Sequence, residues 1–428
     1  MNEREAIDWL NSQLTHGIKP GLSRVQYLLE QLGNPQNQIK TIHVAGTNGK
    51  GTTTLFLNNM LEQHGYKVGS FTSPYIETMN ERISINKQPV NGCELAELVT
   101  QIQPICEEVA KSGEGPPTEF EIITVMAYVY FAKKQVDYAI IEVGLGGRLD
   151  STNVIQPIIS IITTIGYDHV NVLGNSLGEI TQEKAGIIKE NVPVITGVKQ
   201  EEAQKVIQEV SRRCEAPVKW LNQDFHIKII ESTQTGETFD FTRQDCSLDR
   251  VQLSMCGHHQ IENAALAIES FLTIAELEGG GCRSDAIYQG LNQSYWPGRF
   301  EYVQTNPDII FDGAHNVEAV KALIETINER YDPSKVRIIC AFVKNKPIDQ
   351  ILSMMSKNFT NITLTTFDFL NNCGYYELNE KYENYNVSIV RDWKITYDTA
   401  VESLDHSEVL VVTGSLYFVS EIKRKLKL

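Results

Sequence analysis

The stretch TIHVAGTNGKGTT (Thr41–Thr53) decides which fold the chain predicts. Its first five residues favour a buried strand, and an apolar helical pattern follows over 50–64. Glycines between a strand and a helix permit positive φ angles and close backbone approach, so successive N–H groups can surround a phosphate at the helix N-terminus. We therefore predict a P-loop in which Lys50 reaches the β- and γ-phosphate oxygens of a nucleotide.

The match to the P-loop pattern GxxxxGK[ST] is imperfect, because Val44 replaces the first glycine and Gly51 follows the lysine. A glycine-rich turn that merely closes a strand–helix unit is the alternative interpretation. The strand before the loop and the helix after it favour phosphate binding, and Thr52 or Thr53 can place a hydroxyl on Mg²⁺.

Three further polar residues follow predicted strands and extend the site outward. Glu142 ends an apolar strand and precedes a glycine-rich run, which is the place for a carboxylate that holds Mg²⁺. Ser73 offers a hydroxyl oxygen, and His169 is a metal ligand, a base or a structural histidine. Because the carboxyl ends of parallel strands share one crevice, we favour the metal role. The predicted strands are 138–143, 68–72 and 158–165.

Strand-length and helix-length patterns alternate along the chain, which predicts parallel βαβ units. We expect a P-loop NTPase-like domain over residues 1–296 with a mostly parallel sheet, and a small antiparallel appendage at about 225–255. A smaller Rossmann-like α/β domain is expected over 297–428, after Trp296-Pro297-Gly298. The remaining predicted strands are 41–45, 192–196, 309–311, 336–342, 362–366 and 409–413. Predicted helices are 50–64, 93–111, 119–134, 178–189, 260–278, 317–330, 348–357 and 416–427.

Composition excludes several classes of protein. The 428 residues suit two or three domains, and the formal net charge of −16 disfavours a general binder of nucleic acid or anionic membranes. No uncharged apolar run is long enough for a membrane helix, and the acidic N-terminus lacks a secretory pattern. Eight scattered cysteines without a CxxC pair predict reduced thiols. We expect a cytoplasmic monomer.

Two other segments carry charged candidates. Asp312-Gly313-Ala314-His315-Asn316 follows a predicted strand, and Asn316 is suited to cap the next helix. Arg299, just past the predicted boundary, can contact a phosphate. In EKAGIIK, Lys184 and Lys189 lie on the predicted helix 178–189, and we expect one of them on its solvated face.

Taken together, these motifs make the chain resemble folylpolyglutamate synthase and its bifunctional form with dihydrofolate synthase, in the Mur ligase superfamily. GTNGKGT is shared across the superfamily, whereas the other motifs point to the folate branch. In chain order the motifs are HVAGTNGKGT (43–52), TSPY (72–75), NERI (80–83), TEFE (118–121), IEVGLGGRLDSTN (141–153), DH (168–169), EKAGIIK (183–189), WPGRFE (296–301), DGAHN (312–316) and TGSLY (413–417).

The resemblance implies an ATP-dependent amide ligase. It would add L-glutamate to a folate-type carboxylate, either tetrahydrofolate polyglutamates or dihydropteroate, through an acyl phosphate, and would release ADP and phosphate. ATP is then a co-substrate, one or two Mg²⁺ ions are cofactors, and neither nucleic acid nor a membrane is a partner. The pterin-bearing acceptor stays open between the two alternatives.

The resemblance also assigns residues. Lys50, Lys184 and His315 would be catalytic, and Lys184 matches a lysine that family members carry as a carbamate. ATP contacts would come from Asn48, Gly49, Lys50, Gly51, Thr52, Thr53, Asn263, Arg299, Asp312 and His315. Pterin contacts would come from Leu22, Ser23, Arg24, Thr118 and Asp150, with Ser415 on the glutamate side. The metal ligands would be Thr52, Thr53, Ser73, Glu142 and His169. Tyr167 departs from the smaller aliphatic residue that the family often has before Asp-His.

Two rival classes share the P-loop. A nucleotide switch would need an N-K-x-D element to read guanine, and Asn345-Lys346-Pro347-Ile348-Asp349 misses that spacing by one residue. A peptidoglycan-type Mur ligase normally carries a separate N-terminal domain, for which the 45 residues before Gly46 are too few. A pure binding module would leave the γ-phosphate and metal machinery unused. We therefore favour the folate ligase.

Overall fold

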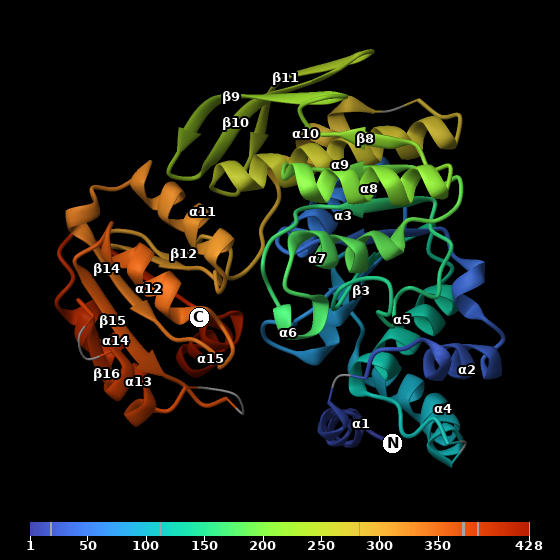
Figure 1. Ribbon diagram of the computed structural model, residues 1–428, viewed down its shortest axis with the longest axis horizontal. Helices are drawn as coiled ribbons and strands as arrows, with labels where there is room; N and C mark the ends of the chain where they lie inside the picture. Colours follow the sequence, from blue (N-terminus) through green and yellow to red (C-terminus); the bar gives the residue numbers. More distant parts are fainter. Residues whose placement is uncertain (18, 112, 282, 370–372, 383–384, 428) are drawn as a thin grey trace. The chain divides into compact units, whose positions relative to one another are not determined.

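The computed structural model describes the chain except for residues 18, 112, 282, 370–372, 383–384 and 428 (Figure 1). The described chain divides into two compact units. The first unit comprises Met1–Lys228, Phe239–Gln252 and Ile261–Ser294, and the second comprises Ile229–Thr238, Leu253–Gln260 and Tyr295–Leu428. Over the described residues, no helix is both long and apolar enough to cross a membrane.

The first unit is built on an eight-stranded sheet with the order β4-β3-β2-β5-β1-β6-β7-β8. The central strand β1 pairs in parallel with β5 and β6, and only β3, which pairs antiparallel with β2 and β4 at one edge, runs the opposite way. The predicted, mostly parallel sheet is therefore confirmed. The strands are β1 (Thr41–Ala45), β2 (Val68–Phe71), β3 (Ile83–Ile85), β4 (Gln88–Pro89), β5 (Tyr138–Glu142), β6 (Ile159–Ile162), β7 (Val194–Thr196) and β8 (Val218–Trp220).

Helices cover this sheet and explain why the P-loop helix has no polar face. Every residue of α3 from Thr52 to Leu61 is buried, because α3 packs between the sheet and α10. By contrast α8 is strongly amphipathic and buries one stripe. The helices are α1 (Glu3–Ser12), α2 (Ser23–Gln31), α3 (Lys50–His64), α4 (Gly92–Lys111), α5 (Glu119–Lys134), α6 (Val170–Leu173), α7 (Leu177–Lys184), α8 (Glu201–Arg213), α9 (His258–Leu277) and α10 (Ser284–Asn292).

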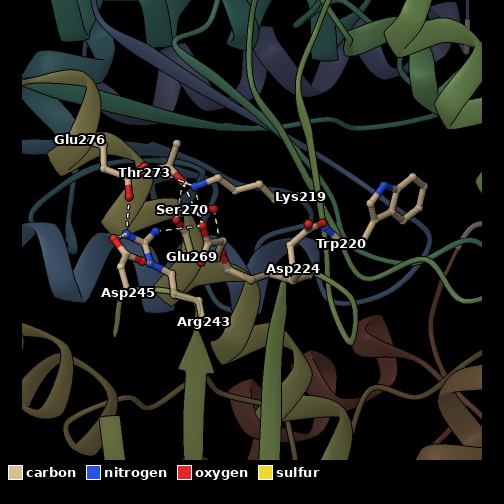
Figure 2. A network of polar contacts seen from close by, with 10 residues as sticks. Lys219, Trp220, Asp224, Arg243, Asp245, Glu269, Ser270, Thr273 and Glu276 are labelled. Carbon is tan, nitrogen blue, oxygen red and sulfur yellow. Dashed lines mark hydrogen bonds and ion pairs between the residues drawn. The ribbon is translucent and has the colours of Figure 1, made fainter. Parts of the chain in front are cut away.

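A separate three-stranded sheet occupies the region where an appendage is predicted, with the order β11-β10-β9 (Figure 1). Its strands are β9 (Phe225–Thr233), β10 (Gly236–Arg243) and β11 (Cys246–Leu253). Figure 2 shows how a polar network ties this sheet to α9. Arg243 and Lys219 both contact the buried carboxylate of Glu269, at 3.2 and 2.7 Å. These ion pairs fix the end of the appendage that belongs to the first unit.

The second unit contains a six-stranded sheet with the order β12-β13-β17-β14-β15-β16. Only the edge strand β12 runs antiparallel, and two apolar clusters pack on the sheet. This is the predicted smaller α/β domain. The strands are β12 (Glu301–Gln304), β13 (Asp308–Phe311), β14 (Val336–Cys340), β15 (Asn361–Thr366), β16 (Ser388–Asp392) and β17 (Val409–Thr413). The helices are α11 (Val317–Asn328), α12 (Ile348–Ser356), α13 (Tyr375–Tyr382), α14 (Trp393–Glu402) and α15 (Leu416–Leu426).

The helix predicted over 178–189 is wrong at its C-terminal end. The α-helix stops at Lys184, and a 3₁₀ turn covers Ala185–Ile187. Close packing causes the stop, because a Cβ atom on Gly186 would lie 2.4 Å from the Arg148 Cα. The predicted solvated lysine is also wrong, since Lys184 is buried and Lys189 lies beyond the helix and is half-buried.

The cysteines match the prediction of reduced thiols as far as they are described. Cys93, Cys106, Cys214, Cys246, Cys256, Cys340 and Cys373 are all free. Cys282 lies outside the described residues.

Candidate active site

The P-loop, residues 46–52, is held by the segment that follows β6. The Thr47 and Asn48 amides donate to the carbonyl and hydroxyl oxygens of Thr164, at 2.8 and 3.0 Å. The Thr163 hydroxyl donates to the Asn48 carbonyl at 2.6 Å. Sequence reasoning missed both threonines. Their signal was a pair of hydroxyl residues at the end of the strand beside β1.

Two glycines of the loop have no room for a side chain. Gly46 has a φ of 151°, and a Cβ atom there would lie 1.9 Å from the Thr163 Oγ1. Gly49 has a φ of 87°, and its Cβ would lie 2.2 Å from the Asn263 Oδ1. The structure thus brings the predicted nucleotide residue Asn263, on α9, next to the P-loop.

Two lysine ammonium groups meet at one backbone oxygen of the loop. Lys50 Nζ lies 3.1 Å and Lys184 Nζ 2.9 Å from the Gly46 carbonyl oxygen. Burial, reinforced by repulsion from Lys50, lowers the pKa of Lys184 to about 7, although Asp168 and Asp150 oppose this. Lys50 is also the first residue of α3, so the positive end of the helix dipole lies at the same place. The arrangement is suited to bind an anion.

The predicted metal ligands are partly brought together. The Glu142 carboxylate is buried at the end of β5 and accepts a hydrogen bond of 3.3 Å from the Ser73 amide. Thr52 and Thr53 lie in the first turn of α3, and the buried Thr53 Oγ1 has no hydrogen-bond partner. His169 caps α6 with a φ of 51°, and its ring lies 3.9 Å from the Asp168 carboxylate.

Oxygen donors of this kind fit Mg²⁺, which prefers carboxylate and hydroxyl ligands and keeps several waters. Within the described part of the chain, no group of three or more His, Cys, Asp or Glu residues is placed to hold a metal ion. The predicted set includes only two residues of those types, Glu142 and His169, so it depends on hydroxyl oxygens and water.

Asp150 holds the glycine-rich loop after β5. Its carboxylate accepts hydrogen bonds from the Leu145 amide at 2.8 Å and from the Thr152 amide and hydroxyl at 3.0 and 2.5 Å. Because the Thr152 hydrogen is used in this way, His43 Nε2, 2.9 Å away, donates to the Thr152 oxygen. Burial lowers the pKa of His43 to about 3, so the ring is neutral. Asp150 therefore has a local positioning role beside the predicted pterin contact.

The residues predicted near the pterin lie at helix starts. Arg24 forms a buried ion pair with Glu121, with Nε 3.0 Å from Oε1. Thr118 caps α5: its hydroxyl accepts a hydrogen bond of 3.2 Å from the Glu121 amide, and its own amide donates to the Glu121 carboxylate at 2.7 Å. Arg24 and Thr118 therefore meet at one carboxylate. Leu22 and Ser23 begin α2. The Arg24 guanidinium is thus engaged in an ion pair inside the protein.

In the second unit, the antiparallel pair β12–β13 gathers the predicted ATP contacts. The Asp312 carboxylate accepts hydrogen bonds from the Phe300 and Ala314 amides at 2.9 and 2.8 Å. Burial raises the pKa of Asp312, while Arg299 opposes this. A Cβ atom added to Gly313 would lie 3.0 Å from the Arg299 Nη1. The His315 Nδ1 lies 2.8 Å from the Gly313 carbonyl oxygen.

Two polar residues after strands β13 and β17 are helix caps. The Asn316 side chain accepts a hydrogen bond of 2.9 Å from the Ala319 amide, which confirms its predicted capping of α11. The buried Ser415 hydroxyl accepts one of 3.2 Å from the Tyr417 amide at the start of α15. The Ser415 oxygen thus already has a structural partner.

The fold and these two sites define a Mur ligase. Residues 44–271 match the Mur ligase middle domain, and residues 298–416 match the glutamate ligase domain of Mur ligases. These matches cover the P-loop sheet and the second unit's sheet, respectively.

Related proteins show to which branch of the Mur ligases the chain belongs. The chain is 40% identical to the dihydrofolate synthase/folylpolyglutamate synthase of Bacillus subtilis, over 99% of both chains. It is 32% identical to the folylpolyglutamate synthase of Lacticaseibacillus casei, over 100% of this chain and 99% of the relative. The solved folylpolyglutamate synthase of Thermotoga maritima is 33% identical with a TM-score of 0.86, over 99% of this chain and 96% of that one. The chain belongs to the folylpolyglutamate synthase and dihydrofolate synthase family of Mur ligases. This supports the folate branch over the peptidoglycan branch and over a nucleotide switch.

Proposed function

We propose that this chain joins L-glutamate to the carboxylate of a pterin-bearing acceptor, through an acyl phosphate formed at the P-loop. ATP-dependent ligation is the activity of its family. The observation that carries the proposal is the convergence of Lys50 and Lys184 on the Gly46 carbonyl oxygen at the start of α3. The Lys50 ammonium and the positive end of the α3 dipole there can hold a polyphosphate and the negative charge that develops when its last phosphoryl group is transferred.

The proposed reaction has two steps. A carboxylate oxygen of the acceptor attacks the γ-phosphorus of ATP, the bond to the bridging oxygen breaks, and ADP leaves. The amine nitrogen of glutamate then attacks the acyl carbon, phosphate leaves, and the nitrogen loses a proton as the amide forms. Phosphoryl transfer requires little covalent chemistry from the protein. The residues therefore act by positioning the reactants and by stabilising their charge.

Each group of residues has a defined part in this proposal. The amides of Gly49 and Gly51 and the Lys50 ammonium would hold the phosphates, and Asn48 and Asn263 would also contact ATP. Mg²⁺, bound through Thr52, Thr53, Ser73, Glu142 and His169, would neutralise phosphate charge. From the second unit, Arg299, Asp312 and His315 would contact the nucleotide. Leu22, Ser23, Arg24, Thr118 and Asp150 would shape the pterin site, and Ser415 the glutamate site.

Lys184 is proposed to carry a carbamate. Carbamate formation needs a neutral amine to attack CO₂, and burial lowers the pKa of Lys184 to about 7, so a large neutral fraction exists near neutral pH. We expect ¹³C-labelled bicarbonate to give a protein carbamate resonance in the wild type and none in Lys184→Met. A wild-type spectrum without that resonance would contradict the modification.

The experiment that tests the function is an ADP-release assay with Mg²⁺, L-glutamate and either dihydropteroate or tetrahydrofolate, followed by mass analysis of the acceptor. We expect ADP release that requires both glutamate and acceptor, with a product one glutamyl residue heavier. Activity with one acceptor or both separates dihydrofolate synthesis from chain extension. ADP release that ignores both acceptors, or no release with either, would contradict the proposal.

A further inference from the structure

The turn that carries Arg299, residues 295–300, has an unusual backbone. Gly298 has a φ of 69°, and Phe300, which has a side chain, has a φ of 46°. A non-glycine residue in the left-handed region is uncommon and persists only where the surroundings hold it. The conformation of this turn therefore requires specific contacts.

Glu301, the first residue of β12, supplies such contacts from one side. Its Oε2 accepts a hydrogen bond of 2.7 Å from the Gly298 amide, and its Oε1 accepts one from the Tyr295 hydroxyl. The same Oε1 lies 2.5 Å from the Lys423 Nζ on α15. Glu301 and Lys423 are only 6% and 4% exposed, so the ion pair is buried.

Asp312 and Gly313 hold the turn from the other side. The Phe300 amide donates to the Asp312 carboxylate at 2.9 Å, and the Gly313 amide donates to the Gly298 carbonyl at 2.9 Å. Arg299, between these anchors, lies against Gly313. Both neighbours of Arg299 in the chain thus have their amide hydrogen bonded to a buried carboxylate.

The Phe300 side chain is buried in the apolar core of the second unit, but the turn also borders an open space. A cavity of about 690 Å³ within the second unit is lined by Trp296, Arg299, Phe300 and Glu301, together with Tyr302 and Tyr331. A side chain that borders such a space has few atoms to block its movement. The polar contacts of the turn therefore help to set the direction of Arg299.

A buried ion pair is weak evidence for stability, because desolvation offsets much of the attraction. Here the pair joins the turn to a helix more than a hundred positions later in the chain, and the carboxylate also binds a backbone amide and a phenol. These contacts fix a geometry, and geometry is what a phosphate-binding guanidinium requires.

We propose that Glu301 and Lys423 are positioning residues that fix the 295–300 turn and so direct Arg299 toward the nucleotide. The inference rests on the proposed function only in taking ATP as the ligand of Arg299. Neither residue contacts the reacting atoms. Their effect passes through Arg299.

The test is a double-mutant cycle between the pair and Arg299, in which stability and ATP kinetics are both measured. Glu301→Gln combined with Lys423→Met removes both buried charges and keeps similar shapes. We expect this variant to raise the KM for ATP about tenfold, because misplacement of a positioned group costs that much or more. In an Arg299→Ala background, the same two substitutions should change the KM for ATP by less than about twofold.

Two further variants keep the test decisive. Tyr295→Phe removes one hydrogen bond to Glu301 without a change in charge, and should raise the KM for ATP about two- to threefold, again only when Arg299 is present. The matched control is Arg337→Met, which breaks the Arg337–Glu408 ion pair of the same unit. It should lower the melting temperature and leave the KM for ATP unchanged.

The outcomes separate the inference from the proposed function. If Arg299→Ala raises the KM for ATP but the Glu301 and Lys423 variant and Tyr295→Phe do not, the positioning role is wrong and the proposed function stands. If the pair's substitutions have equal effects with and without Arg299, their role is only structural. If Arg299→Ala itself leaves the KM for ATP unchanged, the ATP role of Arg299 fails and the inference fails with it.

Discussion

The positively charged residues near the two sheets have different neighbours. In the first unit, Lys50 and Lys184 converge on a neutral backbone oxygen, at 3.1 and 2.9 Å. In the second unit, Lys423 forms an ion pair with Glu301, and Arg299 lies close enough to Asp312 to affect its pKa. The first arrangement keeps positive charge available for an anion. The second uses opposite charges to fix where a group points.

The largest expected effect tests the first arrangement. Lys50→Ala removes the cation of the phosphate site, and we expect kcat/KM for ATP-dependent ligation to fall roughly 10³-fold or more. The melting temperature should stay close to that of the wild type, because Lys50 lies at the start of a helix whose apolar residues remain. The matched control, Lys189→Ala, should keep its activity. Near-normal ligation by Lys50→Ala would remove Lys50 from the phosphate site.

The next prediction tests whether an ion pair in the first unit stabilises the structure, as we infer for the ion pair of the second unit. Arg24→Met leaves the buried Glu121 carboxylate without its partner and should lower the free energy of unfolding by about 3 kcal/mol. The double variant Arg24→Met/Glu121→Gln should recover much of this loss, because no buried charge remains. Chemical denaturation measures both. If the free energy of unfolding of Arg24→Met is unchanged, the ion pair does not stabilise the fold, and Arg24 could instead bind the substrate.

A smaller effect depends on pH and isolates Lys184. Because the folded protein lowers the pKa of Lys184 from 10.5 to about 7, the unfolded chain binds more protons between those values. The free energy of unfolding should therefore rise with pH across this window, by about 2 kcal/mol more in the wild type than in Lys184→Met. Denaturation in CO₂-free buffer from pH 7 to 10 measures the difference. Parallel curves for the two proteins would contradict the lowered pKa.

The smallest effect concerns Ser415. Loss of its capping hydroxyl in Ser415→Ala should cost about 1 kcal/mol of stability. The proposed contact with glutamate adds a second readout, a raised KM for glutamate. Asp392→Ala, which removes the cap of α14, is the matched control and should lose similar stability with an unchanged KM. If the two variants show the same KM for glutamate, Ser415 is a cap alone.

Much of the fold could be predicted from the sequence where local signals agree. β1 and α3 have the predicted bounds because a buried strand, a glycine loop and a long apolar helix follow one another. α5 starts where predicted because Thr118 and Glu121 form a capping box. The edge strand β12 was not predicted, since a four-residue strand carries a weak signal. Helix α8 was missed although its amphipathic pattern is strong, because its composition is mostly polar.

The residues of the candidate site also divide into those with a local sequence signal and those without one. Lys50, Glu142 and Ser73 could be found because they end predicted strands or begin a helix. The roles of Thr163 and Glu301 arise from contacts with residues about a hundred positions away, so the pair of hydroxyl residues at the end of a strand was the only signal for Thr163, and the role of Glu301 could not be found. The burial of Lys184 likewise depends on where its helix stops, which the packing of Gly186 against Arg148 determines.

The most direct test of the account is a crystal structure of this protein with Mg²⁺ and a non-hydrolysable ATP analogue. We expect the β- and γ-phosphates to lie against the amides of residues 49–51, with an oxygen within hydrogen-bond distance of the Lys50 Nζ. A triphosphate bound elsewhere, with the Gly46 carbonyl and both amines unchanged, would contradict it.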